Sequence, residues 1–577
     1  METRLNYLNA QQPMTQSKEF NGKLLLVITL QAICMSWIAL WNSPVCDEVG
    51  HLTAGLYIWE TGHVTVYPVN PPLVKLIASL PAAVLDPQTD WNSVASVQAL
   101  RPEFEIGKQF IRINGQDSYL YHTYGRLCCI PFTLLGTFIC YKWSRELYGD
   151  TAGCFSAICW AISPTVLGWG TTFTPDVASA SLGCISLYSF TCWLKNRTLS
   201  HSVYAGIFLG IALLTKLSLI LLLVLFPVYW LIHNVFTSGW KSVHKNASQM
   251  IVVIALGIYL TNAGYLFQGT FRSLGSFEFV SDVLNGSSGP GIVGNSFRDT
   301  VLSGIPVPFP EDFIRGIDLQ KLDFERGMSS YLFGQWSERG WWYYYIVALT
   351  LKEPVGLLVL SFLAGLHTIV KARQKKLTVD EYLLIATALI TFVLISSQTG
   401  FSRYIRYTLP VFPAMFIVIG GMYCACTHYL KRIGLCALLI WSCVSSACVF
   451  PHHLSYFNEL AGGPLNGYQF LLDANVDWGQ DLIRLKSWLS EHAKGKSVFC
   501  AHTGFVLPTE VGVECDWIPK IAHNNDKAKR SLQLDPGLYV VSVNELFQEK
   551  SQYRYLLEYP RIATIGYSMW VYEITEP

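Results

Sequence analysis

The chain has few charged residues for its length. Only 14% of its 577 residues are Asp, Glu, Lys or Arg, whereas a typical soluble domain carries about 25%. Hydrophobic residues make up 51%, and the net charge of +1 gives no overall attraction to nucleic acid. This composition excludes a string of ordinary soluble domains and predicts a protein that crosses a membrane several times.

Several motifs of soluble enzymes are also missing. No GxGxxG or Walker motif lies between an expected strand and helix, so no nucleotide-binding loop is predicted. No internal repeat is visible, and the apolar run at 24–40 is typical of an uncleaved signal anchor. Most of the 16 cysteines lie in apolar runs, and no CxxC pair has metal-binding spacing. Cys500 and Cys515 would pair only in an oxidising compartment.

Long apolar runs dominate the first 450 residues and predict about eleven membrane spans. Lys216 separates two of the runs, so 202–236 is either a hairpin or one broken helix. The sequence Lys352-Glu353-Pro354 predicts a kink or a membrane boundary within another run. The runs are 24–41, 125–144, 151–169, 175–194, 202–216, 217–236, 249–267, 342–370, 381–398, 405–427 and 433–450.

Basic residues gather in alternate loops and predict the orientation. Lys and Arg follow the second span, the fourth span and each later even-numbered one, which is typical of cytoplasmic loops. We therefore expect an integral, multi-pass protein of a bacterial cell membrane, with its N-terminus in the cytoplasm. The predicted parts are a cytoplasmic tail at 1–23, a membrane domain at 24–450 with outer loops at 42–124 and 268–341, and an extracytoplasmic domain at 451–577.

The C-terminal part has a different pattern. Short β-like runs at 497–501, 537–543 and 565–573 alternate with a helical stretch near 481–490, which predicts a small α/β domain. The predicted fold class is therefore mainly α, a polytopic membrane bundle with this domain appended. Before it, the stretch from 452 to 482 is dense in Asn, Asp, Tyr, Trp and Gly, and suits either sugar recognition or a polar domain junction.

Two adjacent acids follow the first span in the sequence CDEVGH. On a helix, Asp47, Glu48 and His51 are three or four residues apart and share one side. Three interpretations remain open for them. The acids could cap the helix and interact with its dipole, one acid could be a general base, or all three side chains could hold a divalent metal.

Asp176 lies at the start of a later span, on the same expected face as Asp47 and Glu48. Its position after Pro175 also suits an ordinary helix start. Cations on that face oppose the usual orientation bias, and they suit either a lipid phosphate or snorkelling at helix ends. These cations are Lys75, Arg126, Lys216, Arg403 and Arg406.

Six segments carry a family resemblance that covers roughly residues 20–450. They resemble the GT-C class of membrane glycosyltransferases, in particular the protein O-mannosyltransferase and aminoarabinose-transferase-like group of glycosyltransferase family 39. The chain lacks the MIR domain of the protein mannosyltransferases, so a lipid or glycan acceptor is at least as consistent with it as a protein. The segments are CDEVGHLTAGLYIWETG, YPVNPPLVKL, FTPDVA, GIALLTKLS, GWWYYYIVALTLKEPVG and SRYIRYTLPVFP.

The resemblance implies a polyprenyl-phosphate-linked sugar donor and an inverting transfer on the extracytoplasmic face. Asp47 or Glu48 would be the base that deprotonates the acceptor, and Asp176 would be a second acid lining the site. A lipid phosphate leaves readily and needs cations more than a strong acid. No cofactor is certain, and a divalent metal remains open. The candidates for binding the substrate or the lipid phosphate are His51, Lys75, Arg126, Lys216, Arg403 and Arg406.

Two other classes of function compete with this one. A transporter or flippase of a lipid-linked or anionic substrate would predict repeated halves and ionisable residues near the bilayer midplane. The sequence has no repeat, and its acids gather at one expected face. A non-catalytic assembly or sensor protein is the other alternative, which the retained acids disfavour.

Overall fold

The computed structural model describes residues 18–575, except 93, 95–100, 239–240, 287–288, 290 and 522–532. Within these residues, nine helices are long and apolar enough to cross a membrane. A tenth span results if the bent pair α7 (Asp150–Ile162) and α8 (Pro164–Gly170) is counted as one. The nine spans are built on α1 (Lys18–Trp41), α6 (Asp117–Tyr148), α9 (Pro175–Lys195), α11 (Leu221–Ser238), α12 (Lys241–Gly264), α16 (Val355–Arg373), α17 (Val379–Ser397), α18 (Phe412–Ala425) and α19 (Tyr429–Cys448). The spans that contain α11 and α18 begin earlier, at Leu217 and Ile405.

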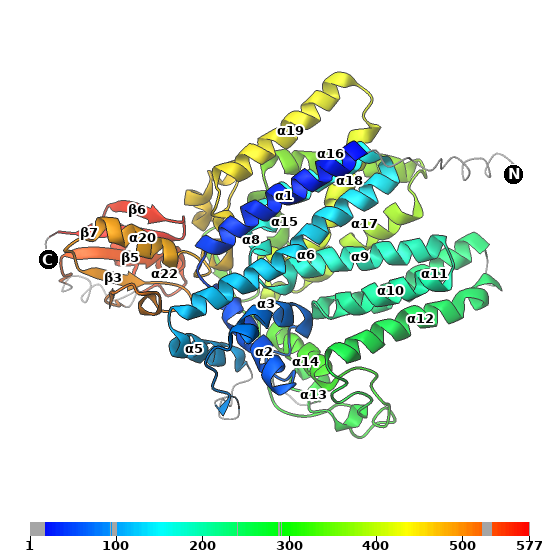
Figure 1. Ribbon diagram of the computed structural model, residues 1–577, viewed down its shortest axis with the longest axis horizontal. Coiled ribbons are helices and arrows are strands. Elements are labelled where there is room, and N and C mark those ends of the chain that lie inside the picture. The colour runs from blue at the N-terminus through cyan, green and yellow to red at the C-terminus, as the bar shows by residue number, and fades with distance from the viewer. Residues whose placement is uncertain are drawn as a thin grey trace.

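Three of the eleven predicted runs are not single straight spans. The run at 151–169 is the bent pair α7 and α8, and the other two are interrupted where the sequence predicts, at Lys216 and at Lys352-Glu353-Pro354. The run at 202–216 forms α10 (Leu199–Leu213), a shorter apolar helix that packs between α9 and α12 (Figure 1). Lys216 lies in an extended break before η2 (Leu217–Ile220), so α10 and α11 are two separate helices. The run at 342–370 is divided at Glu353-Pro354 into α15 (Tyr344–Lys352) and α16, because proline cannot continue the preceding helix.

Charged loops meet at one end of the bundle. Lys195 at the end of α9 lies 2.9 Å from Asp380 at the start of α17, and Trp143 of α6 donates to the same carboxylate. Lys371 at the end of α16 forms an ion pair with Glu381 of α17. Figure 1 shows that the chain also enters the bundle at this end.

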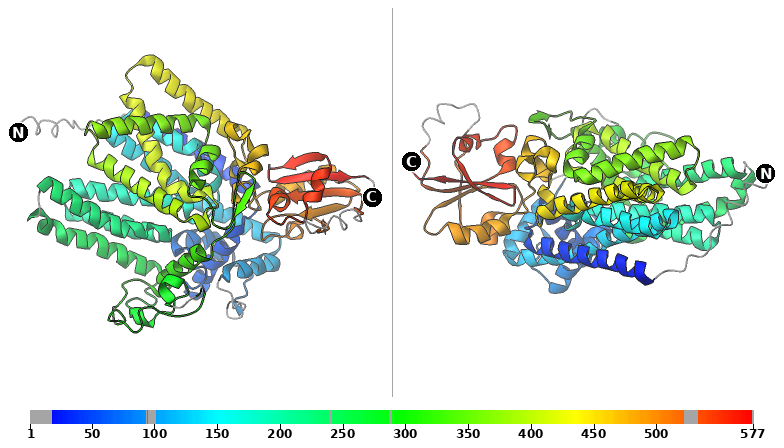
Figure 2. Two further views of the ribbon diagram at one scale, coloured as in Figure 1. Left: turned by 180° about the vertical axis from the view of Figure 1, so that it is seen from behind. Right: turned by 90° about the horizontal axis from the view of Figure 1, so that it is seen from above.

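The two predicted outer loops, at 42–124 and 268–341, and the C-terminal part at 451–577 lie at the opposite end of the bundle. We call this the sheet-bearing end (Figures 1 and 2). Helices α2 and α3 cross so closely there that a Cβ at Gly55 would lie 2.2 Å from the Lys75 carbonyl. This crossing therefore requires glycine at position 55. The helices at this end are α2 (Cys46–Thr61), α3 (Pro72–Leu85), α5 (Glu103–Asn114), α13 (Asp282–Asn285) and α14 (Glu311–Arg326).

The C-terminal part contains a five-stranded mixed sheet in the order β4-β3-β5-β7-β6. β3 pairs in parallel with β4 and β5, whereas β7 pairs antiparallel with β5 and β6. The apolar side of α20 (Leu482–His492) packs into the same core as this sheet. The strands are β3 (Val498–Ala501), β4 (Asp516–Trp517), β5 (Gly537–Ser542), β6 (Arg561–Ile565) and β7 (Met569–Ile574).

These elements confirm the predicted fold class, a mainly helical membrane bundle with a small C-terminal α/β part. The predicted strands at 497–501 and 537–543 correspond to β3 and β5, and the run at 565–573 ends β6 and forms most of β7. A separate hairpin of β1 (Ser330–Leu332) and β2 (Gln335–Ser337) lies in the segment before α15, and α22 (Val543–Phe547) follows β5 directly. Cys500 and Cys515 are free thiols in side-chain contact.

Candidate active site

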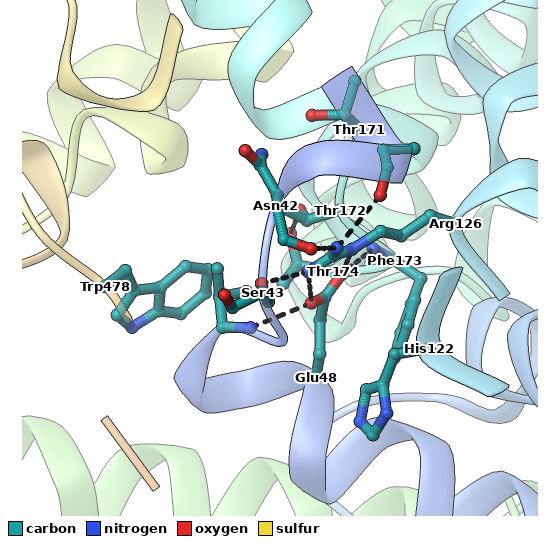
Figure 3. Close-up of polar contacts among 12 residues, drawn as sticks. Asn42, Ser43, Glu48, His122, Arg126, Thr171, Thr172, Phe173, Thr174 and Trp478 are labelled. Carbon is teal, nitrogen blue, oxygen red and sulfur yellow. Dashed lines mark hydrogen bonds and ion pairs between the residues drawn. The ribbon is translucent and has the colours of Figure 1, made fainter. Parts of the chain in front are cut away.

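The two adjacent acids of α2 have different partners. Glu48 is completely buried, and its carboxylate accepts the backbone N–H groups of Val45 at 3.0 Å and Phe173 at 3.2 Å. It also accepts two hydrogen bonds from Arg126, at 2.9 Å from Nε and 2.5 Å from Nη2 (Figure 3). Every lone-pair direction of Glu48 is therefore used inside the protein.

Every N–H group of the Arg126 guanidinium donates a hydrogen bond inside the protein. Besides Glu48, it donates to the carbonyl oxygens of Ala39, Asn42 and Ser43. These bonds occupy all five N–H groups of the arginine, so none remains for a lipid phosphate. The buried pair instead fixes the turn between α1 and α2 against α6 (Figure 3).

Asp47 points to a different group of residues. Its carboxylate accepts from Arg406 Nη2 at 2.7 Å and keeps 21% of its side chain exposed. Arg406 Nε lies 3.8 Å from Asp176, and Asp176 accepts from Lys216 Nζ at 2.6 Å. The four side chains form a row of alternating charge in the order Asp47, Arg406, Asp176, Lys216, which we call the charge row.

Each member of the charge row comes from a different element. Asp47 lies in the first turn of α2, and Asp176 lies in the first turn of α9 after Pro175. Arg406 belongs to the short helix η5 (Ile405–Val411), and Lys216 occupies the break before η2. The fold therefore brings two predicted acids, from separate segments of the chain, into contact with two of the five predicted cations.

Aromatic rings surround the central arginine. The Arg406 guanidinium carbon lies 4.5 Å from the centre of the Trp478 ring and 5.1 Å from that of Trp169. Tyr404 and Tyr407 contribute two further ring faces at 4.9 and 5.5 Å. Such faces attract a cation and restrict its position. None of these four residues was among the predicted site residues, although Tyr404 and Tyr407 flank Arg406 in the sequence.

The segment that precedes the C-terminal sheet closes the site. The carbonyl oxygen of Trp478 accepts the N–H of Cys46 at 3.2 Å, and that of Gln480 accepts the N–H of Ser43 at 2.8 Å. The polar stretch from 452 to 482 is thus a domain junction, and its Trp478 side chain also contacts the charge row.

A cavity of about 680 Å³ adjoins the Lys216 end of the charge row. It lies among α9, α11, α14, α17 and η5, and most of its lining is apolar. Lys216 and Tyr407 belong to this lining, so a cationic group stands beside a space suited to hydrocarbon. Further lining residues include Ala180, Gly183, Leu187, Leu221, Leu384 and Ala388.

Lys75 and His51 lie deeper, beside Tyr67. Lys75 is buried, and its Nζ donates to the carbonyl oxygens of Val66 at 3.1 Å and Tyr67 at 3.0 Å. Burial lowers the pKa of Lys75 to about 7. The ring of His51 packs 4.6 Å from that of Tyr67, and neither of its nitrogens has a hydrogen-bond partner among the described residues. Burial, then Lys75 and Arg406, lower the pKa of His51 to about 3, so the ring is neutral.

Arg403 lies outside the charge row. Its guanidinium forms an ion pair with Asp473, and its carbonyl oxygen accepts from Asn475 Nδ2 at 2.7 Å. These contacts attach the 473–475 segment to the chain before η5. Arg403 is thus committed to the same junction as Trp478.

The possible metal ligands do not converge. Asp47 contacts Arg406, Glu48 contacts Arg126, and His51 packs against Tyr67. Across the described part of the chain, no group of three or more His, Cys, Asp or Glu side chains is arranged to hold a metal ion. The arrangement offers carboxylate and cation chemistry instead, next to an apolar cavity.

Comparison with known proteins gives one family match. Residues 121–263 match the family described as dolichyl-phosphate-mannose-protein mannosyltransferase, and this region contains Arg126, Asp176 and Lys216. A search of curated proteins found no significant sequence match.

Two solved structures are similar at low identity. ArnT from Cupriavidus metallidurans, bound to undecaprenyl phosphate, has 12% identity over 96% of this chain and 98% of that chain, with a TM-score of 0.46. The S. cerevisiae protein O-mannosyltransferase Pmt1–Pmt2 complex, bound to the sugar donor, has 19% identity. The match covers 42% of this chain and 33% of that chain, with a TM-score of 0.30. The family match confirms the resemblance found in the sequence, over the part of the chain that the family model covers.

Proposed function

We propose that the protein transfers a sugar from a polyprenyl-phosphate donor to a hydroxyl-bearing acceptor at the sheet-bearing end of its bundle. The acceptor is a lipid, a glycan or a protein. This end faces the extracytoplasmic side of a cell membrane in the proposal, as the basic loops at the other end suggest. The observation that carries the proposal is the different surroundings of Asp47 and Glu48.

Asp47 is the general base in this mechanism. Glu48 has no free lone pair, whereas Asp47 is partly exposed and accepts a hydrogen bond from Arg406. Asp47 takes the proton of the acceptor hydroxyl as the acceptor oxygen bonds to the anomeric carbon. The bond between that carbon and the phosphate oxygen breaks in the same displacement, and polyprenyl phosphate leaves. A positioned base of this kind contributes about 10²–10⁴-fold to the rate.

The order of the charge row suits an inverting displacement. Asp47 is at one end and Lys216 at the other, with Arg406 and Asp176 between them. A base and a phosphate-binding cation on opposite sides of the sugar are what a single displacement requires. Lys216, with Arg406, stabilises the negative charge that develops on the leaving phosphate. Asp176 holds both cations in position.

The apolar cavity accommodates the lipid part of the donor. Its volume of about 680 Å³ and its apolar lining suit several isoprene units, and Lys216 stands at its edge. Lys75, Arg126 and Arg403, which were also candidates for the phosphate, are committed to backbone or junction contacts. The proposal therefore assigns the phosphate to Lys216 and Arg406.

The test is a transfer assay with purified protein in lipid vesicles. Polyprenyl-phosphate sugars labelled in the sugar are supplied with membrane lipid, glycan or peptide acceptors, and the labelled product is measured. We expect Asp47→Asn to reduce transfer at least 100-fold while the variant keeps the thermal stability of the wild type. Undiminished transfer by stable Asp47→Asn protein would refute Asp47 as the base. Wild-type protein that uses none of the lipid-linked donors would refute the donor class.

A further inference from the structure

The segment after α12 exposes several large apolar side chains. Val301 is 96% exposed, and the other five are between 47% and 66% exposed. Contiguous exposed apolar surface on a protein usually marks a site of interaction. The six side chains are Phe271, Val283, Ile292, Val293, Val301 and Ile305.

Part of this segment forms a hydrogen-bonded hairpin. The N–H of Phe271 donates to the carbonyl of Val307 at 2.9 Å, and that of Val307 donates to Arg272 at 3.0 Å. The N–H of Leu274 donates to the carbonyl of Ile305 at 2.9 Å. These bonds hold residues 271–274 against residues 305–307. The exposed side chains of Phe271, Val301 and Ile305, which we call the apolar tip, therefore stand on a fixed support.

An ion pair connects the hairpin to the rest of the sheet-bearing end. Arg272 pairs with Glu311, the first residue of α14. Gln320 and Phe324 of the same helix line the apolar cavity. The position of the hairpin is therefore tied to one wall of that cavity.

The exposed apolar surface continues from a membrane-spanning helix. Tyr259 of α12 is 57% exposed, and its ring lies 5.5 Å from that of Phe267, which is also exposed. α12 is long and apolar enough to cross a membrane, and only 28% of its most apolar stretch is buried within the protein. Aromatic side chains at the end of a span are typical of the boundary between lipid and water. Phe271 lies four residues further along the chain than Phe267.

The hairpin is also placed at the rim of the bundle. Figure 1 shows that the segment lies at the end of α12. It includes α13, lies beside α14 and is far from the C-terminal sheet. The view from behind shows the same separation (Figure 2). The apolar tip can therefore meet the surface of the bilayer that α12 crosses, without obstruction by the sheet.

We propose that the hairpin formed by residues 271–274 and 305–307, with the neighbouring Val301, is seated in the lipid leaflet next to the sheet-bearing end. Phe267, Phe271, Val301 and Ile305 enter the boundary between head groups and acyl chains, as the apolar faces of interfacial segments do. Arg298 and Asp299, which are exposed beside the tip, remain among the head groups. The partner is the phospholipid bilayer itself, and this inference does not depend on the proposed transferase activity.

The test places a fluorescent non-natural amino acid at position 301 of the full chain. The protein is reconstituted in nanodiscs of phosphatidylethanolamine and phosphatidylglycerol, with or without bromine placed along the acyl chains from the head-group end to the middle. Bromine quenches only a fluorophore that contacts it. We expect brominated lipid to quench the fluorophore at 301 severalfold more than unbrominated lipid does.

Two other exposed apolar positions serve as controls. Phe362 on the span α16 is 66% exposed and should be quenched, whereas Trp517 in β4 is 60% exposed and should not be. Quenching at 301 close to that at 362 supports the proposal. Quenching at 301 as weak as at 517 overturns it and leaves a protein partner for the same surface. Size-exclusion profiles equal to the wild type show that each labelled protein is folded.

Discussion

At the scale of single residues, two neighbouring carboxylates differ because of the groups that surround them. Glu48 meets two backbone N–H groups and a buried guanidinium, so it is a structural anion. Asp47, one residue earlier, turns to the partly exposed charge row. Their places in the sequence are nearly equivalent, and only the packing of α1, α6 and residue 173 around the helix start distinguishes them.

Glu48→Gln should destabilise the protein. The substitution removes the negative charge opposite Arg126, and a buried charge left without its partner costs about 3–5 kcal/mol. We expect a clearly lower midpoint of thermal unfolding, measured in detergent micelles, than for the wild type. Asp47→Asn is the matched control, because the adjacent residue lies at a partly exposed site and should change the midpoint little. Equal midpoints for the Glu48→Gln and Asp47→Asn proteins would contradict the structural role of Glu48.

Trp478 should act through Arg406. A cation on an aromatic face gains about 0.5–2 kcal/mol, so Trp478→Leu should lower the turnover number of transfer about tenfold. Trp478→Phe keeps an aromatic face, although a smaller one than the indole, and should restore most of the rate. The comparison is made from kcat and KM for the donor at equal protein stability. A leucine variant as active as the phenylalanine variant would show that only packing matters at this position.

At the scale of elements, the sequence predicts the spans well and their junctions poorly. A membrane requires long apolar runs, which a linear pattern reveals, and α9, α12 and α17 lie where their runs predict. The division between α10 and α11 was one of two alternatives, because Lys216 alone could not show whether the chain bends. The roles of Arg126 and Trp478 could not be predicted, because they depend on contacts between segments hundreds of residues apart.

For the candidate site too, the sequence predicts the residues but not their contacts. Asp47, Asp176, Lys216 and Arg406 were all predicted from their positions at the ends of apolar runs, and the structure brings them into one row. Arg126 has the same sequence signature and a different role. Charge near a span end therefore identifies candidates, whereas their partners depend on tertiary packing.

The cavity beside α17 gives a prediction about the length of the donor lipid. Ala388 lines the cavity, and Ala388→Phe adds a bulky ring to its wall. We expect the KM for a long polyprenyl-phosphate sugar to rise about tenfold, while a donor with only two isoprene units is used nearly as before. The adjacent Leu389 is 60% exposed and points away from the core, so Leu389→Phe is the matched control. Equal effects on long and short donors would place the lipid elsewhere.

At the scale of the whole molecule, the C-terminal sheet is connected to the site by a short route. Ser542, the last residue of β5, donates to the carboxylate of Asp477, and Asn544 donates to its carbonyl oxygen at 2.8 Å. The next residue is Trp478, whose ring lies on Arg406. The sheet thus supports the charge row through one buried acid, so its attachment should respond to the protonation of that acid.

Asp477 should make stability depend on pH. Burial is the main cause that raises the pKa of Asp477 to about 7, against bonds from Ser542 and Gly479 that lower it. Between the ordinary value near 3.8 and 7, the folded protein holds a proton that the unfolded chain has lost. The free energy of unfolding contributed by this group is therefore present at low pH and is lost as pH rises through 7.

Asp477→Asn removes this dependence, because the amide stays neutral. The variant should differ least from the wild type in thermal unfolding near pH 4, and it should be the more stable protein near pH 8.5. Asp481 gives the opposite control, because Arg484 is the largest influence that holds its pKa below the usual value despite burial. Asp481→Asn should therefore be less stable than the wild type at both pH values. An identical pH slope for the wild type and Asp477→Asn would show that Asp477 is ionised at the junction throughout, and that the sheet is attached by a charged carboxylate.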